Sequence, residues 1–260
     1  MFKKESMQLK KILITTPQVY SKRLQQSLEN YGFKVFVYPG IITEIITNEE
    51  FKELFEHFDE YSFIILPSRN AIKSFFYNAT VYGFRGKIPA TAKFATIGRD
   101  AKLLESYGFS DNLQASEAST DGLVRALKNR SNISKIAVIT PKVEIISEPY
   151  IIPKFISDLK SFVQVTAISG YVTKPNFGLN IENLRKSLIN SEVDAILFTS
   201  AGEIEALEYL LGGENLLSKT KIICFGPYTA KAAFDKGLKV FYTGKNFHSF
   251  DSFAQELVSL

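Results

Sequence analysis

The chain has 260 residues, 45% of them hydrophobic and 22% charged, so it can bury a sizeable core and is neither collagen-like nor disordered. Its net charge of +4 is too mild to indicate nucleic-acid binding, although a small anionic ligand stays possible. A single cysteine and two distant histidines exclude a disulfide framework and a Cys/His zinc set, and no apolar run approaches the about 18 residues of a membrane span. We therefore expect a cytoplasmic monomer with no metal, no cofactor and no nucleic-acid or membrane partner.

Short apolar runs recur along the chain and alternate with amphipathic stretches, a pattern typical of buried parallel strands and surface helices. We expect strands within 11–17, 33–39, 61–68, 93–98, 135–141, 163–169, 193–200, 221–227 and 238–244. We expect helices within 21–32, 69–79, 101–109, 121–130, 181–190, 203–213, 229–237 and 250–260. Glycines end four of these helices: Gly32, Gly108, Gly212 and Gly237. The alternation predicts an α/β fold.

The chain also repeats itself. ILITTP at 12–17 resembles IAVITP at 136–141, and later matches place Ser68 opposite Ser200 and Gly98 opposite Gly226. The matches occur in the same order and at nearly constant spacing. The sequence therefore predicts two similar α/β halves.

Small, hydroxyl-bearing and glycine residues dominate the junctions where a strand ends and a helix begins. In open α/β sheets ligands bind at these junctions, where helix N-termini present free N–H groups to anions. The candidate binding residues there are Ser68, Arg69, Asn70, Gly98, Ser119, Thr120, Lys142, Thr199, Ser200, Ala201, Gly226, Pro227, Tyr228 and Thr229. The same residue types are also ordinary helix caps, so both interpretations stay open.

Several familiar sites are missing from these junctions. The first strand is not followed by the dinucleotide fingerprint G-x-G-x-x-G, and neither a P-loop nor a G-x-S-x-G elbow occurs. The strand ends also lack the acidic residues of a phosphoacceptor domain. His57 lies in EEFKELFEHF, where we expect a solvated residue on a helix surface. Acid–base chemistry must therefore come from another side chain.

Three segments in fixed order carry a resemblance to the uroporphyrinogen-III synthase family: LPSRNAIKSF, ICFGPYTAKAAFDKGL and the Y-x-T that begins at Tyr171. The resemblance extends from ILITTP to the last expected helix. It implies an enzyme that takes the linear tetrapyrrole hydroxymethylbilane, expels its terminal hydroxyl and closes the ring with inversion of the last pyrrole. It implies no cofactor and no metal.

The resemblance also implies a fold of two flavodoxin-like parallel-sheet domains joined by a two-stranded extended linker. The first strand and helix of each half would pack into the other domain, with crossovers at 33–41 and 163–175. One domain would contain 1–37 plus 175–260, the other 38–174, and the bilane would bind in the cleft between them.

By the same resemblance Tyr171 is the expected catalytic acid, and Ser200 and Thr229 would contact substrate carboxylates. We expect basic side chains at the cleft rim to add to binding, with Arg69, Arg99, Lys142 and Lys231 as candidates.

The chain departs from the family pattern after its first strand, where Thr15, Thr16 and Pro17 stand in place of a common T-R-P, and in the short GRDA loop, where Asp100 replaces a usual threonine. We therefore expect the C-terminal junctions to lead in binding. A non-catalytic two-domain binding protein for an anionic ligand remains the alternative.

Overall fold

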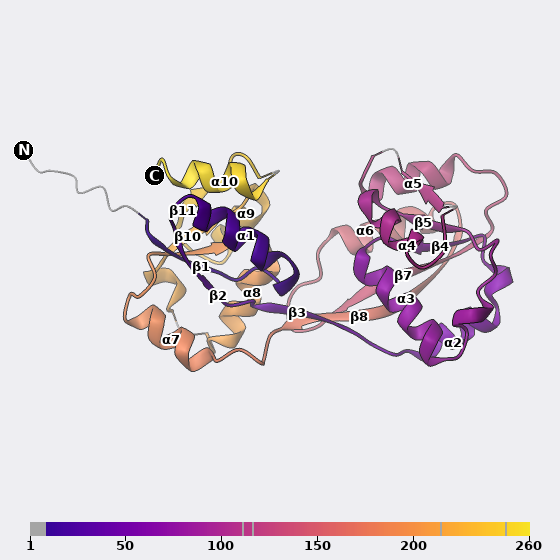
Figure 1. Cartoon of the computed structure of the whole chain (residues 1–260), viewed down its shortest axis with the longest axis horizontal. Coiled ribbons are helices and arrows are strands. Elements are labelled where there is room, and N and C mark those ends of the chain that lie inside the picture. The colour runs from indigo at the N-terminus through magenta and orange to yellow at the C-terminus, as the bar shows by residue number, and fades with distance from the viewer. Residues whose placement is uncertain (1–8, 111, 116, 214, 248) are drawn as a thin grey trace, which may run out of the picture. The chain divides into compact units, whose positions relative to one another are not determined.

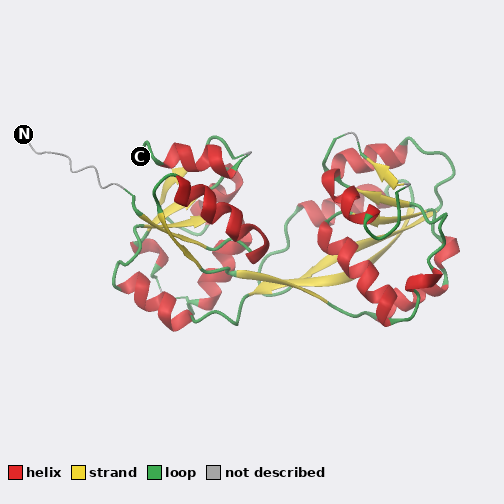
Figure 2. Ribbon diagram, in the orientation of Figure 1, coloured by secondary structure: helices red, strands yellow, loops and turns green. Residues whose placement is uncertain are grey.

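A computed structural model describes residues 9–260 except 111, 116, 214 and 248, and it divides into two compact units. Unit 1 contains the residues up to Ile42 together with Ile145–Ser147 and Lys174–Leu260. Unit 2 contains Thr43–Glu144 and Glu148–Thr173. In each unit strands lie between helices, as Figure 2 shows.

Unit 1 is built on a parallel five-stranded sheet in the order β11-β10-β9-β1-β2. If the five strands are renumbered 1 to 5 in chain order and read from the β2 edge, their order is 2-1-3-4-5, which is the order of flavodoxin-like folds. Its strands are β1 (Lys11–Ile14), β2 (Lys34–Val37), β9 (Ala195–Phe198), β10 (Lys221–Cys224) and β11 (Val240–Thr243). Its helices are α1 (Gln18–Asn30), α7 (Ile181–Ile189), α8 (Ala201–Leu210), α9 (Pro227–Asp235) and α10 (Phe250–Leu257).

Helices cover both faces of this sheet because every central strand is apolar on both sides. Leu13 of β1 packs with residues of α7, α8 and α9, whereas its neighbours Ile12 and Ile14 pack with α1 and α10. Alternate residues of a strand point to opposite faces, which explains the division. The expected glycine helix ends are confirmed, since Gly32 and Gly237 have φ of 88° and 73°.

Unit 2 contains a six-stranded sheet in the order β3-β8-β7-β4-β5-β6. Its strands are β3 (Ile41–Ile45), β4 (Phe63–Leu66), β5 (Phe94–Thr96), β6 (Asn112–Gln114), β7 (Lys135–Val143) and β8 (Gln164–Pro175). Its helices are α2 (Glu49–Glu56), α3 (Arg69–Val81), α4 (Ala101–Glu105), α5 (Thr120–Lys128) and α6 (Ile151–Lys160). The strands from β8 to β6 are parallel neighbours.

The two sheets exchange the opening strands of the sequence repeat (Figure 1). β1 and β2 begin the first half of the repeat, yet they share a sheet with β9, and β1 pairs with it. β7 and β8 begin the second half, yet they share a sheet with β4, and β7 pairs with it. The two halves of the repeat are therefore not the two units.

β3 and β8 carry the chain across the boundary between the units. Backbone hydrogen bonds join Asn176 to Gly40 (2.9 Å) and Ile46 to Gly170 (3.0 Å); one residue number rises as the other falls, so these segments are antiparallel.

The expected crossover at 33–41 begins too early, because Lys34–Val37 of that segment form β2 inside the sheet of unit 1. The boundaries accordingly lie after Ile42 and before Lys174 rather than after 37 and 174, and Ile145–Ser147 belongs to unit 1.

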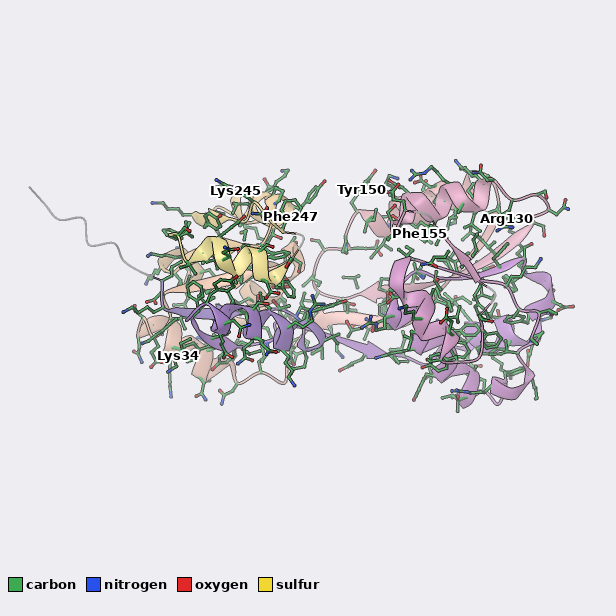
Figure 3. All side chains as sticks on the ribbon, turned by 45° about the horizontal axis from the view of Figure 1, so that its top comes forward. Lys34, Arg130, Tyr150, Phe155, Lys245 and Phe247 are labelled. Carbon is green, nitrogen blue, oxygen red and sulfur yellow. The ribbon has the colours of Figure 1, made fainter. Side chains whose placement is uncertain are left out.

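Among the described strands and α-helices, the sequence patterns did not predict β3, the three-residue β6 and α6. β6 is the polar tripeptide NLQ, which has no apolar run to identify it. α6 carries Pro153 near its start, and it buries Phe155. Figure 3 labels Phe155 and the exposed Tyr150, which precedes the helix. Among the described residues, no helix has the length and apolar character that crossing a bilayer demands.

Candidate functional site

In unit 1 the candidate residues gather at one edge of the sheet. β1, β9 and β10 are parallel neighbours, so the segments after them, at Thr15, Thr199 and Phe225, leave the sheet on the same side. Helices α1, α8 and α9 begin there. This is the edge at which open α/β sheets bind their ligands.

These three helices begin without a side-chain cap. Pro17, Ser200 and Gly226 occupy the cap positions of α1, α8 and α9, and none of them accepts a hydrogen bond from the helix through its side chain. In contrast, Asn180 and Ser249 cap α7 and α10 with their side chains. First-turn N–H groups that have no partner in these helices therefore keep their capacity to bind an anion.

A buried glutamate that the sequence analysis did not single out occupies the start of α8. Glu203 is fully buried, and its Oε2 accepts hydrogen bonds from Thr15 Oγ1 (2.8 Å) and from the Thr199 N–H (3.0 Å). Its Oε1 accepts from Thr199 Oγ1 and from Ser200 Oγ (3.2 Å). Burial raises the pKa of this carboxyl group, while the bonds from Thr199, Thr15 and Ser200 act in the opposite direction.

One signal in the sequence could have revealed this residue. Ser200 and Glu203 form the S-x-x-E pattern of a capping box, in which the glutamate is the third residue of the helix. The pattern places Glu203 near the strand end. It does not reveal the bond to Thr15, which lies 188 residues away in the chain.

The start of α9 combines a buried threonine with an exposed tyrosine. Thr229 is 5% exposed, and its hydroxyl donates to the Thr199 carbonyl at 3.2 Å. Tyr228 is 88% exposed, beside Pro227 in the first turn. Gly226 lies against Phe247, since a Cβ at the glycine would be 3.3 Å from that ring.

In unit 2 the structure brings Ser68 and Tyr171 together. Ser68 caps α3 by accepting the Ala71 N–H at 3.2 Å, and its Oγ lies 3.1 Å from the Tyr171 hydroxyl. Tyr171 is 7% exposed. Burial raises the pKa of its phenol, and the hydrogen bond with Ser68 opposes that rise.

A close approach of α3 to β8 holds Tyr171 in place. Ser74 of α3 donates to the Gly170 carbonyl at 2.6 Å, and a Cβ at Gly170 would overlap the Ser74 hydroxyl and lie 2.7 Å from Ile139. The register of β7 with β8 shifts between Thr140 and Pro141, beside Tyr171. Only glycine fits before the tyrosine because the helix and the strand are so close.

The remaining candidates of unit 2 lie at its strand ends. Arg69, at the first position of α3, pairs with Asp100 at 3.4 Å, and Asn70 follows it half-buried. Gly98 has a φ of 57°, and its carbonyl accepts from Gln114 at 2.8 Å.

Ser119 caps α5, donates to Glu117 at 2.7 Å, and precedes the half-buried Thr120. Lys142 is exposed and pairs with Glu144 at 2.8 Å.

Several of the junction hydroxyls donate to acceptors within the protein in this structure. The hydroxyl hydrogens of Thr199 and Ser200 go to Glu203, that of Thr229 to a carbonyl, and that of Ser119 to Glu117. Buried polar groups are satisfied internally wherever partners exist, and here they do.

Of the expected rim cations, Lys231 pairs with Asp235 one turn along α9 at 2.9 Å, and the Arg99 side chain lies outside the described residues. His57, as expected, is exposed; its ring lies 3.3 Å from Glu60.

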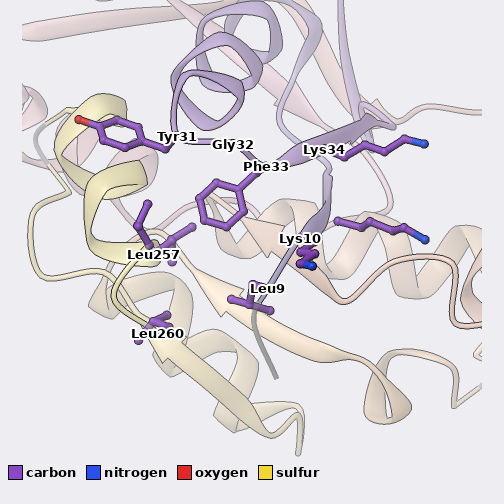
Figure 4. A pocket seen from close by; sticks show the side chains of 10 residues that line it. Leu9, Lys10, Tyr31, Gly32, Phe33, Lys34, Leu257 and Leu260 are labelled. Atoms are coloured by element: carbon purple, nitrogen blue, oxygen red, sulfur yellow. The ribbon is translucent and has the colours of Figure 1, made fainter. Parts of the chain in front are cut away.

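A pocket of 440 Å³ in unit 1 lies at the opposite edge, where β1 and β2 begin. Figure 4 shows Leu9, Phe33 and Leu257 around it, so its floor is apolar and it lacks the helix N-termini of the candidate site. Among the described residues no group of three or more His, Cys, Asp or Glu side chains could hold a metal ion.

Comparison with known proteins agrees with this arrangement. Residues 22–253 match the family model described as uroporphyrinogen-III synthase HemD. A porphyrin biosynthesis protein HemD from Ruminiclostridium josui is 26% identical to this chain, and the match covers 96% of this chain. The same match covers only 48% of that relative's length.

Two solved structures share the fold. The uroporphyrinogen-III synthetase of Helicobacter pylori has a TM-score of 0.63 at 14% identity, with 96% of this chain and 99% of that chain covered. A mutant uroporphyrinogen III synthase from Thermus thermophilus has a TM-score of 0.59 at 18% identity, with 95% and 96% covered. With nine-tenths of its residues inside the family model, the chain belongs to the uroporphyrinogen-III synthase family.

Proposed function

We propose that the chain is a uroporphyrinogen-III synthase, which cyclises hydroxymethylbilane with inversion of the last pyrrole ring and loss of water. Beyond family membership, the observation that supports this reaction is the contact of the buried Tyr171 with the half-buried Ser68 at the carboxyl end of the unit 2 sheet. A neutral phenol can give its proton to a departing hydroxyl.

The proton donor is Tyr171 in this proposal. Electrons from the pyrrole nitrogen expel the terminal hydroxyl of the bilane as its C–O bond breaks, and the phenol proton converts that hydroxyl to water. A phenol has a pKa of about 10 and burial raises it here, so the group is protonated at neutral pH.

Ser68 orients this proton. Its oxygen accepts the Ala71 N–H, so its own hydrogen can be donated to the Tyr171 oxygen. When Ser68 is the donor, the phenol hydrogen is not used by Ser68 and is available to a substrate. A chain of hydrogen bonds from the start of α3 thus prepares the acid before substrate arrives.

The carboxylates of the bilane would bind at the uncapped helix starts of α8 and α9. Each such contact typically contributes about 0.3–1 kcal/mol, and up to about 2 kcal/mol when partly buried. Ala201, Gly226, Pro227 and Tyr228 lie in these first turns or at their caps. Several weak contacts together suit a polycarboxylate.

Positioning supplies the remainder of the catalysis. Holding two ends of one molecule in reacting geometry converts ring closure into a favourable intramolecular step. Other parts of the catalytic site need only bind and orient.

An assay with hydroxymethylbilane tests the proposal. We expect the type III isomer to exceed the spontaneous type I product. If the purified protein binds the bilane or product but yields only type I, the non-catalytic binding protein is the better description.

We propose also that the protein works in the cytoplasm as a monomer without nucleic-acid partners. The fully buried Cys224 supports the cytoplasmic location, and the mild net charge of +4 supports the absence of nucleic-acid partners. Gel filtration of the purified protein would report its oligomeric state.

A further inference from the structure

Glu203 has no part in the proton transfer proposed above, yet this carboxyl group is fully buried at the substrate-binding edge of unit 1. Burying a carboxyl group is costly unless hydrogen bonds replace its hydration. The four donors from Thr15, Thr199 and Ser200, two on each oxygen, supply that replacement and match the acceptor sites of a carboxylate.

An ordinary capping box would not need this burial. In that motif the serine oxygen accepts an N–H of the first turn and the glutamate returns to the serine N–H. Here Ser200 makes no cap bond, and its hydroxyl donates to Glu203 instead. The carboxyl group turns inward to Thr15 at the end of β1. The serine hydroxyl is thus diverted from the helix to the glutamate.

We infer that Glu203 is a positioning residue that turns the hydroxyl hydrogens of Thr199 and Ser200 inward. The two side chains then present oxygen lone pairs, not donors, to an anionic ligand, and the backbone N–H groups at the start of α8 are left as its donors there. This inference rests on the proposed function, because it concerns how the same edge binds a polycarboxylate.

The Thr199 N–H determines how a glutamine at position 203 would orient, and this makes the inference testable. In a Glu203→Gln variant, a backbone N–H must still donate to an oxygen, so the amide oxygen takes the place of Oε2. The amide nitrogen then takes the place of Oε1 and donates to the Thr199 and Ser200 hydroxyl oxygens. Both hydroxyl hydrogens are released and can turn toward a bound carboxylate.

The experiment titrates uroporphyrinogen III, under anaerobic conditions, against the parent protein, E203Q, S200A and the double variant. We expect E203Q to bind the product about 3- to 10-fold more tightly, the gain of one or two hydrogen bonds to a charged group. The gain should shrink in the S200A background, because one of the released hydroxyls is then missing. Unchanged or weaker binding by E203Q would overturn the inference.

S200A alone gives a second, independent result. Its hydroxyl hydrogen is committed to Glu203, so we expect its product binding to stay within about twofold of the parent. A loss of about fivefold or more would mean that Ser200 donates directly to the ligand, which contradicts the inference. This half-exposed residue can be replaced without burying any new group, so the result is obtained even if E203Q folds poorly.

Glu208→Gln is the matched control. It lies on the same helix and pairs with Lys236 at 2.7 Å, away from the strand end. It should bind the product as the parent does. If the parent forms no type III isomer, the proposed function fails, whereas the effect of E203Q on the titration still decides the role of Glu203.

Discussion

The ring of Tyr171 is almost enclosed, and its hydroxyl lies 3.1 Å from the Ser68 hydroxyl. Replacing the tyrosine by phenylalanine keeps the ring and removes the donor. If the phenol is the acid, turnover should fall by about 10²- to 10⁴-fold while substrate binding changes little. Single-turnover rates and the ratio of type III to type I product would measure this. If turnover falls by less than about threefold, Tyr171 contributes to packing and is not the proton donor.

The pH dependence of turnover offers a separate check on the same group. The active form of the acid is the neutral phenol, which is lost only as pH rises through its folded-state pKa, and burial raises that pKa. We therefore expect this group to cause no decline in single-turnover rate between pH 7 and about 9.5, below the ordinary tyrosine value of about 10. A base limb centred below pH 9 that Tyr171→Phe abolishes would contradict the raised value.

Asp100 restrains a cation at the edge of unit 2. Its carboxylate lies 3.4 Å from the Arg69 guanidinium, and Arg69 is the first residue of α3. Asp100→Asn removes a negative charge and frees Arg69, so product binding should tighten by about two- to fivefold at low salt and less at high salt. Titration at two ionic strengths measures this. Equal binding by parent and variant at low salt would show that Arg69 does not reach the ligand.

At the scale of elements, the approach of α3 to β8 sets the position of Tyr171. Gly170→Ala would place a methyl group against the Ser74 hydroxyl and 2.7 Å from Ile139, so either α3 or β8 must shift. We expect a loss of about 1–3 kcal/mol in the free energy of unfolding and a lower turnover. Gly86→Ala is the control, since no atom lies within 4 Å of its Cβ position. Chemical denaturation of both variants should separate them; equal stability would refute the close packing.

At the scale of the whole molecule, the exchange of strands predicts which fragments fold. Apart from Ile145–Ser147, unit 2 is one continuous stretch, 43–173, and it holds every strand of its sheet from β4 to β8. A fragment of these residues should unfold cooperatively on heating, as followed by circular dichroism.

The first half of the repeat, residues 1–133, should not fold in this way. It contains β1 and β2 without β9, and β4 without β7, so each partial sheet lacks a central neighbour. A cooperative transition in this second fragment would mean that β1 can pair within its own half.

Local patterns were enough to predict much of this molecule. The α/β class, most strands and helices, the two-fold repeat and the junction residues all follow from apolar runs, helix periodicity and glycine stops, which act over a few residues. The exposure of His57, which directly follows α2, can be predicted in the same way. The partnership of Tyr171 with Ser68 was not among the expectations, because 103 residues separate them.

Only the tertiary structure decided which strands share a sheet and where the junction hydroxyls point. The run ILI at 12–14 suits β4 and β9 equally well as a neighbour, since both are apolar throughout, and the choice depends on long-range packing. Likewise, Thr199 and Ser200 have the same local sequence whether they cap a helix or donate to Glu203. The hydrogen bond that Thr15 donates to Glu203, across 188 residues, selects the second arrangement, because a buried carboxyl group accepts from the donors that the fold brings to it.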